Sequence, residues 1–571
     1  MSTLDWLILC GTLAVIVGYG VTKTRGRQDL SGYLRGGDHR WLAVGLSVMA
    51  TQASAVTFLS LPGQAFDDGM RFIQLYFGLP LAMVVLSVLF VPRYFAARVF
   101  TAYQFLENRF DLKTRQLTAF LFLLQRGLSA GITIYAPAIV LSSQLGWPLR
   151  STCLAIGSVV ILYTVMGGNR AVVRTQKQQM LVMLAGLLVA LIVILVRLSP
   201  QLSLAHALQV AGTLGKLNLV DVSTDLGARY TLWSGLIGGF FLALAYFGTD
   251  QSQVQRYLSA RSVAECRIGL LCNGLLKLPM QLIVLFVGVM VFVFYQLHPP
   301  PLFFNRAELA QAESAGAGSA LAALQTEHDL AFVRRRAQIE RLDKALTAGD
   351  TATIAAARQE LRRAHREVTA IREKARSAIA KAVPRANPKD ADYVFLAFVT
   401  QNLPRGVVGL LLAVILCAAM SAVAGELSAL SSTTLIDFYQ RSVRPHASDA
   451  HYVWAARLFT VVWGALALAF AILAALLDNL IQAVNILGSL FYGTVLGIFV
   501  TGFLLRRVQG TAVFVAAIIS ELLVLALFKW SQVSFLWFNL VGCLAVAAIA
   551  TALTALRATR PARAKQEPSG N

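Results

Sequence analysis

Charged residues are scarce in this sequence. They make up 14% of its 571 residues, and only 29 residues are acidic; soluble domains carry about 25% charged residues. Hydrophobic residues reach 57%, and the mean hydropathy is +0.64. This composition excludes a soluble globular protein and predicts a chain that crosses a membrane many times.

The sequence also lacks the short segments of alternating polar and apolar residues that build a membrane β-barrel. Its apolar runs are long and unbroken, and a bilayer core of roughly 30 Å needs about 20 such residues per helix. The runs therefore predict an all-α polytopic membrane protein. Thirteen membrane helices are expected, at about residues 4–22, 41–65, 72–92, 117–145, 149–167, 177–197, 231–250, 266–297, 395–435, 452–476, 480–504, 510–530 and 535–556.

Groups suited to catalysis are missing as well. All seven histidines fall in loops or at helix ends, so a metal enzyme inside the membrane would lack imidazole ligands. No phosphate-binding loop or nucleophile elbow stands in a suitable context. The six cysteines lie singly in or beside predicted membrane helices, which argues against a disulfide framework. We expect neither an enzyme nor an organic cofactor.

Basic residues, by contrast, are in surplus, with a formal net charge of +21. They are spread over alternate loops, whereas binding of a nucleic acid would need them clustered on one soluble domain. By the positive-inside rule these loops are cytoplasmic. The rule places the N-terminus outside and the C-terminus inside, in the cytoplasmic membrane of a bacterium-like cell, with residues 557–571 as a basic cytoplasmic tail.

One long hydrophilic segment interrupts the apolar pattern. Residues 299–390 alternate charges at helical spacing around a stripe of Ala and Leu. This predicts a helical hairpin that turns near "TAGD", where Asp350 caps the second helix. The segment should lie outside the membrane and divide the membrane domain into residues 1–298 and 391–556. Two interpretations stay open: a solvated insertion packed loosely on the outer face, and a docking or lid element.

Helix-breaking residues interrupt two of the predicted membrane helices. The second helix contains "SLPG", residues 60–63, and the seventh contains "GLIGG", residues 235–239. Counting from one interruption to the other gives two halves of five helices with breaks at matching positions. This pattern is typical of an inverted-repeat transporter with a site near the bilayer midplane. Glycine in a membrane helix can also serve close helix packing.

Four stretches carry more specific information. They are "WLAVGLSVMATQASAVTFLSLPGQAFDDG", "YTVMGGNRAVVRTQKQQM", "AYFGTDQSQVQRYLSARSVAE" and "LPRGVVGLLLAVILCAAMSAVAGELSALSSTTLIDFYQR". In this order, within residues 36–504, they resemble the sodium:solute symporter family. The resemblance implies a LeuT-type fold, with one helix before and two helices after the inverted five-helix repeats. It also implies alternating access driven by an ion gradient.

The resemblance further implies a set of sodium ligands. Family members hold the ion with backbone carbonyls of the broken second helix and of the ninth helix, and with two hydroxyls on the ninth. The carbonyl positions match Ala50, Ala53 and Ala418. Ser421 matches the first hydroxyl, but Ala422 replaces the second, so one ligand of the sodium ion is missing.

Two further residues leave the coupling ion open. Gln176 stands where family members usually carry an Asp that is thought to help the ion leave. Glu426 lies four residues after Ala422, on the same face of the ninth helix, and a carboxyl group inside a membrane helix costs about 3 kcal/mol or more. It could carry a proton, lend charge to an altered cation site, or pair with a nearby Arg. Sodium coupling is the first expectation, and proton coupling or uncoupled transport is the alternative.

Contacts to a solute are expected beside the two breaks. By resemblance, Thr57 matches a polar sugar ligand of some members, Tyr246 an aromatic gate, and Lys277 a lysine that contacts substrate; Gln52 lies in the same broken helix as Thr57. The charges of Lys277 and Arg126 favour a carboxylate or another anionic solute, although each of these residues can also be structural. The sequence thus indicates cation-coupled symport of a small organic solute across the bilayer, with a non-transporting membrane sensor as a further alternative.

Overall fold

Helices form the regular structure of the computed structural model, which describes residues 2–24, 30–34, 39–383, 389–473 and 480–558. Within these ranges there is no β-strand, and ten helices are long and apolar enough to span a membrane. The predicted helices at 4–22, 41–65 and 231–250 correspond to shorter apolar helices, at Thr3–Ile16, Trp41–Gln52 and Ser234–Thr249. The all-α polytopic class is confirmed, but the exact count of thirteen spans is not.

The elements up to the hydrophilic segment are α1 (Thr3–Thr24), α2 (Leu30–Leu34), α3 (Trp41–Gln52), α4 (Ala55–Asp68), η1 (Gly69–Tyr76), α5 (Leu79–Val85), η2 (Leu86–Phe90), α6 (Val91–Ala97), α7 (Gln104–Arg109), α8 (Leu112–Leu145), α9 (Leu149–Leu198), α10 (Leu204–Thr213), η3 (Ser234–Gly238), α11 (Gly239–Thr249), α12 (Gln251–Tyr257) and α13 (Val263–Leu297). The remaining elements are α14 (Arg306–Ala312), η4 (Glu313–Ala317), α15 (Gly318–Ala348), α16 (Thr351–Ala382), α17 (Ala391–Asn402), α18 (Val407–Thr433), η5 (Thr434–Val443), α19 (Asp449–Leu473), α20 (Leu480–Leu504), α21 (Gly510–Trp530) and α22 (Leu536–Ala558).

Several helix boundaries differ from those expected. The predicted spans 149–167 and 177–197 correspond to two spans of α9, Leu149–Asn169 and Val172–Leu198, which meet at a kink where Gly168 has φ at +56°. The predicted span 395–435 is two helices, α17 and α18, because Pro404 and Gly406, with φ at +88°, end the first before the second begins. Residues 559–571 of the predicted basic tail lie outside the described residues.

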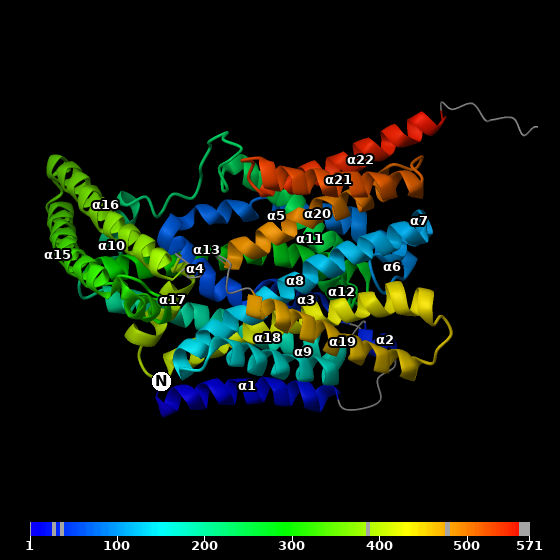
Figure 1. Cartoon of the computed structure of the whole chain (residues 1–571), viewed down its shortest axis with the longest axis horizontal. Coiled ribbons are helices and arrows are strands. Elements are labelled where there is room, and N and C mark those ends of the chain that lie inside the picture. Colours follow the sequence, from blue (N-terminus) through cyan, green and yellow to red (C-terminus); the bar gives the residue numbers. More distant parts are fainter. Residues whose placement is uncertain (1, 25–29, 35–38, 384–388, 474–479, 559–571) are drawn as a thin grey trace, which may run out of the picture.

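Helix α18 lies at the centre of the bundle. It packs against α9, α8, α4 and α3, and nearly all of its side chains are buried. In Figure 1, α1 runs along one side of the molecule beside α9, and α21 and α22 run along the opposite side. The buried carboxylate of Asp5 on α1 accepts hydrogen bonds from the backbone N–H groups of Gly406 (2.7 Å) and Gly409 (3.1 Å). This carboxylate therefore joins α1 to the first turn of α18.

Helices α15 and α16 form a long hairpin that projects beyond one end of the membrane helices (Figure 1). Asp350 caps α16, because its side chain accepts from the N–H groups of Ala352 and Thr353. On which side of the membrane the hairpin lies, and the division of the chain into residues 1–298, 299–390 and 391–556, stay predictions.

Buried polar contacts hold this hairpin against the membrane helices. Arg335 donates to the carbonyl of Tyr295 in α13 (2.9 Å), and Arg362 donates to the carbonyl of Thr213 in α10 (3.1 Å). The apolar side of the hairpin forms a core cluster of its own with Leu302 and Phe303. These contacts join the hairpin to α13 and α10, and whether it is a solvated insertion or a docking or lid element stays a prediction.

Candidate functional site

The first break in the membrane helices separates α3 from α4. Helix α3 ends at Gln52, Ala53 and Ser54 leave the helical conformation, and α4 begins at Ala55. The prediction of a break at "SLPG" was wrong, because Pro62 lies inside α4. Proline removes one backbone hydrogen bond from a helix. In a membrane protein this is tolerated, because neighbouring helices can satisfy the backbone group that is freed. The backbone groups freed at Ala53 lie at the centre of the bundle, and Ala53 itself is fully buried.

The second break separates α11 from α12. Helix α11 ends at Thr249, Asp250 is extended (φ −78°, ψ 117°), and its carboxylate caps α12 by accepting from the N–H group of Ser252. The predicted break at "GLIGG" was also wrong. A Cβ on Gly235 would lie 2.0 Å from the carbonyl oxygen of Gln74, so this glycine serves close helix packing.

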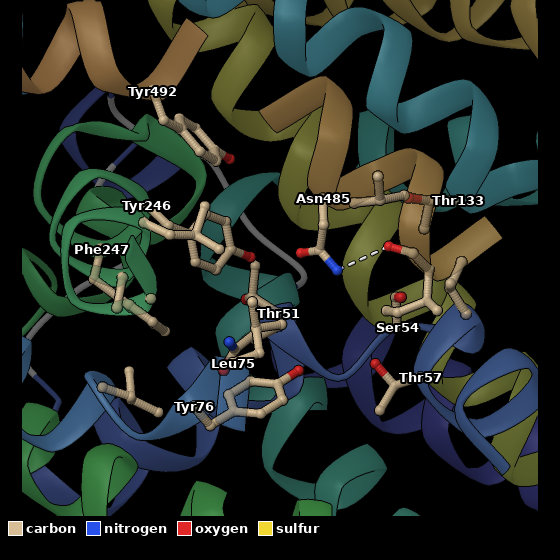
Figure 2. Close-up of a pocket in the computed structure, with 18 of the residues that line it drawn as sticks. Thr51, Ser54, Thr57, Leu75, Tyr76, Thr133, Tyr246, Phe247, Asn485 and Tyr492 are labelled. Atoms are coloured by element: carbon tan, nitrogen blue, oxygen red, sulfur yellow. Dashed lines mark hydrogen bonds between the residues drawn. The ribbon is translucent and has the colours of Figure 1, made fainter. Parts of the chain in front are cut away.

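A cavity of about 110 Å³, with polar and apolar lining residues, lies between the two breaks. Figure 2 shows Tyr246 and Tyr492 on one side of it and Ser54 and Thr57 on the other. Its walls come from α3, α4, η1, α5, α8, α11, α18 and α20, and they consist of Thr51, Gln52, Ser54, Val56, Thr57, Leu75, Tyr76, Leu79, Arg126, Thr133, Gly239, Leu242, Ala243, Tyr246, Phe247, Glu426, Ile481, Val484, Asn485 and Tyr492.

A buried cluster of charges forms one end of this cavity. Arg126 of α8 donates to Glu426 of α18 (3.0 Å) and to Asp250 at the second break. Tyr492 of α20 donates to Asp250 (2.8 Å) and also contacts the guanidinium of Arg126. Arg126, Asp250 and Glu426 are each at most 5% exposed, so each charge depends on the others for compensation. The second carboxylate oxygen of Glu426 has no hydrogen-bond partner among the described residues.

The candidate sodium ligands lie where α3 meets α18. The hydroxyl of Ser421 donates to the carbonyl oxygen of Ala50 (3.0 Å). Ala53 lies in the break itself, and Ala418 and Ala422 are buried on α18 on either side of Ser421. The structure therefore brings the carbonyl of α3 and the hydroxyl of α18 together.

Gln176 of α9 occupies the same junction. Its amide nitrogen donates to the hydroxyl of Thr51 (2.9 Å) and to the carbonyl of Ser421 (3.2 Å), and its amide oxygen accepts from Ser47. Gln176 thus joins α3, α9 and α18 through neutral hydrogen bonds.

The predicted solute contacts divide into two groups. Gln52, Thr57 and Tyr246 line the cavity, and the hydroxyl of Tyr246 accepts from Gln253 (2.6 Å). Lys277 of α13 is not among the lining residues. It is fully buried, and its Nζ has no hydrogen-bond partner among the described residues.

Sequence reasoning missed Asp250, Tyr492, Tyr76 and Asn485. Asp250 carried a signal, because it is the single acidic residue in the predicted span 231–250, and an ionisable residue in a membrane span indicates a functional site. The other three residues carried none. Their side chains reach the cavity only through the packing of η1 and α20 against the broken helices.

Two broken helices around a central cavity are the arrangement of the LeuT-type fold. A sodium-coupled sialic acid symporter, solved in a substrate-bound outward-open state, matches 97% of this chain and 98% of its own with a TM-score of 0.75 and 21% identity. The nucleobase-cation-symport-1 family transporter Mhp1, in a closed conformation with bromovinylhydantoin bound, has a TM-score of 0.51 and 11% identity. The match covers 92% of this chain and 96% of that transporter.

The model of the sodium:solute symporter family matches residues 33–325 and 373–520. The chain belongs to this family and is an integral membrane protein. The family model leaves residues 326–372 unmatched, and these residues form most of the α15–α16 hairpin.

Curated relatives are sodium-coupled transporters. The sodium/iodide cotransporter of Homo sapiens is 33% identical over 297 residues, which cover 51% of this chain and 45% of that protein. The sodium-coupled monocarboxylate transporter 2 of Mus musculus is 24% identical over 503 residues, covering 87% and 68%. The sodium-dependent multivitamin transporter of Oryctolagus cuniculus is 32% identical over 262 residues, covering 45% and 40%. In two of these three alignments, the chain spans less than half of the relative's length.

Proposed function

We propose that the chain is a secondary active transporter that couples symport of a small organic solute to sodium by alternating access. The observation that carries this proposal is the approach of the Ser421 hydroxyl to the Ala50 carbonyl, 3.0 Å apart, beside the break between α3 and α4. Membership of the family and the sodium-coupled relatives support it.

In this proposal the oxygens of Ala50, Ala53, Ala418 and Ser421 hold the sodium ion. Hard cations prefer such oxygen ligands, and the break leaves carbonyls near Ala53 without helical partners. Ala422 offers no side-chain oxygen, so a water molecule completes the coordination and sodium binds weakly. No organic cofactor and no catalytic residue enter the proposal.

The sodium site can be tested before any solute is known. We expect Ser421→Ala to weaken binding of radioactive sodium to the purified protein by about tenfold, because one charge-assisted oxygen contact is lost. Ala422→Ser should strengthen it by a similar factor, because it supplies the missing hydroxyl. Scintillation proximity binding measures both. Ser432→Ala, which removes a buried hydroxyl of α18 that bonds to its own helix, is the matched control. Equal sodium binding in Ser421→Ala and in the unaltered protein would contradict the site.

Proton coupling is the second candidate, and one observation favours it. Glu426 lines the cavity with one carboxylate oxygen that lacks a partner among the described residues, as expected of a group that takes up and releases a proton. Uptake that persists when choline replaces sodium and disappears with a protonophore would select this mechanism. A solute that binds but is never taken up into vesicles would select a non-transporting sensor.

For the solute, we propose an uncharged polar molecule or one that carries an ammonium group. The expectation of an anion came from Arg126 and Lys277. Arg126 contacts two carboxylates, and Lys277 does not line the cavity. Arg126 and Glu426 are the charged residues of the lining and balance each other, and Asp250 also pairs with Arg126, so no basic charge is left to attract an anion. Tyr76, Tyr246 and Tyr492 supply aromatic faces that favour a cation.

A thermal-shift screen in sodium and in choline tests this preference. We expect sugars or amino compounds to raise the unfolding midpoint, and we expect monocarboxylates to cause no rise that depends on Tyr246. A ligand at a hundredfold excess over its dissociation constant stabilises the folded state by about 2.7 kcal/mol. Stabilisation by acetate or pyruvate that is lost in Tyr246→Ala would contradict the preference.

We also propose the cytoplasmic membrane of a bacterium-like cell as the location, with the N-terminus outside and the C-terminus in the cytoplasm. The distribution of basic residues over alternate loops supports this orientation.

A further inference from the structure

A second cavity lies at the base of the α15–α16 hairpin, away from the candidate transport site. Its volume is about 200 Å³, and it shares no lining residue with the first cavity. Its walls come from the hairpin, the ends of α4 and α13, and the segment that follows α10. The lining residues are Phe66, Asp67, Lys216, Phe292, Tyr295, Gln296, Pro300, Arg335, His365, Val368, Thr369, Arg372 and Arg376.

Basic groups outnumber acidic groups around this cavity. Asp67 is the acidic residue of the wall and lies 3.7 Å from Arg376, Asp390 lies behind the wall, and Glu373 also pairs with Arg376 (3.4 Å). Arg372 and Arg376 both pair with Asp390, at 3.0 and 2.7 Å. Arg335 has no carboxylate partner among the described residues and donates to the backbone carbonyl of Tyr295 (2.9 Å), whereas Lys216 donates to the backbone carbonyl of Asp67 (2.5 Å) near the side chains of Asp67 and Asp68.

The cavity also contains donors that lack acceptors. The Nε atoms of Arg335 and Arg376 are buried and have no hydrogen-bond acceptor among the described residues. Arg335 is only 2% exposed, and a buried guanidinium that lacks a carboxylate is costly. Burial, together with the charges of Arg335 and Lys216, lowers the pKa of His365 to about 3. His365 is therefore neutral, and the buried charge of Arg335 is left without a carboxylate partner among the described residues.

We propose that this cavity binds a small oxyanion, a phosphate or carboxylate group, held by Arg335, Arg376 and Lys216. Guanidinium groups match the oxygens of both anions and bind them through short charge-assisted hydrogen bonds. The ligand is either a free anion or the phosphate of a lipid headgroup. Because the three residues come from α15, α16 and the segment after α10, the bound anion fastens the hairpin to the ends of α4 and α13.

The test uses the full-length purified protein. Its unfolding midpoint is followed while inorganic phosphate, acetate or short-chain phosphatidylglycerol replaces chloride at constant sodium and ionic strength. We expect at least one of the three to raise the midpoint, and the responding compound identifies the source of the anion. Arg335→Gln should raise its half-saturating concentration at least tenfold, because a charge-assisted donor is lost. Arg336→Gln, one residue further along α15, is the matched control, because Arg336 is exposed and pairs with Glu340.

A second variant covers the case in which Arg335→Gln does not fold. Lys216→Gln removes a charge from the opposite wall and leaves the hairpin sequence unchanged, and it should weaken the response by a similar factor. The proposal is overturned if none of the three compounds stabilises the unaltered protein, or if the folded variants respond as the unaltered protein does. Neither variant touches the sodium site, so sodium binding should be unchanged in both, whatever the outcome for the proposed transport function.

Discussion

Arg126→Leu should lower the free energy of unfolding by about 3–5 kcal/mol and abolish solute uptake. The guanidinium of Arg126 contacts both Asp250 and Glu426, and all three side chains are buried. Its removal leaves two carboxylates beside each other inside the membrane domain without a counter-charge. Thermal unfolding in detergent, followed by tryptophan fluorescence, measures the loss.

A triple variant separates this electrostatic effect from lost packing. Arg126→Leu combined with Asp250→Asn and Glu426→Gln removes all three charges, and we expect it to recover most of the lost stability, because no uncompensated charge remains. Uptake should stay absent, because the cavity loses the charged side chains of Arg126 and Glu426 from its lining. An unfolding midpoint of Arg126→Leu equal to that of the unaltered protein would show that the cluster has no structural role.

Gly63→Leu should prevent stable folding. Gly63 lies on α4, and a Cβ there would be 1.8 Å from the carbonyl oxygen of Ala391 at the start of α17. Backbone atoms cannot turn aside as a flexible side chain can, so the cost should exceed the roughly 1–3 kcal/mol usual for overpacking.

The amount of folded protein recovered after size-exclusion chromatography measures the effect of Gly63→Leu. Gly11→Leu in α1 is the matched control, because no atom lies within 4 Å of the point that a Cβ on Gly11 would occupy. It should leave the yield unchanged. A normal yield of Gly63→Leu would mean that α4 and α17 pack differently from the arrangement described.

Much of the helical architecture could be predicted from the sequence. The predicted spans 480–504 and 510–530 coincide with α20 and α21, because polar or glycine-containing turns bound apolar runs of membrane length. The breaks could not be located. Pro62 is tolerated within α4, whereas the chain opens at Ala53 and Ser54, which carry no local breaker. The opening follows from the packing of neighbouring helices, which a single sequence does not reveal.

The candidate site, too, could be predicted from the sequence only in part. Thr57 and Tyr246 lie on the cavity, as the family motifs predicted, although their roles stay predictions. Lys277 illustrates the limit, because no residue of α13 lines the cavity and its side chain is buried in the interior of the bundle. Glu426 was singled out as a membrane carboxyl group, but its link through Arg126 to Asp250 depends on three helices far apart in the sequence.

The contact between Asp5 and the first turn of α18 has a consequence for biosynthesis. Asp5 and Gly406 are separated by 401 positions in the chain. A ribosome that adds about 5–20 residues per second therefore needs roughly 20–80 s to make Gly406 after Asp5. During this time α1 can pack against α9, its other neighbour, but not against α18. The docking of α1 onto α18 must therefore be a late step in the assembly of the newly made protein.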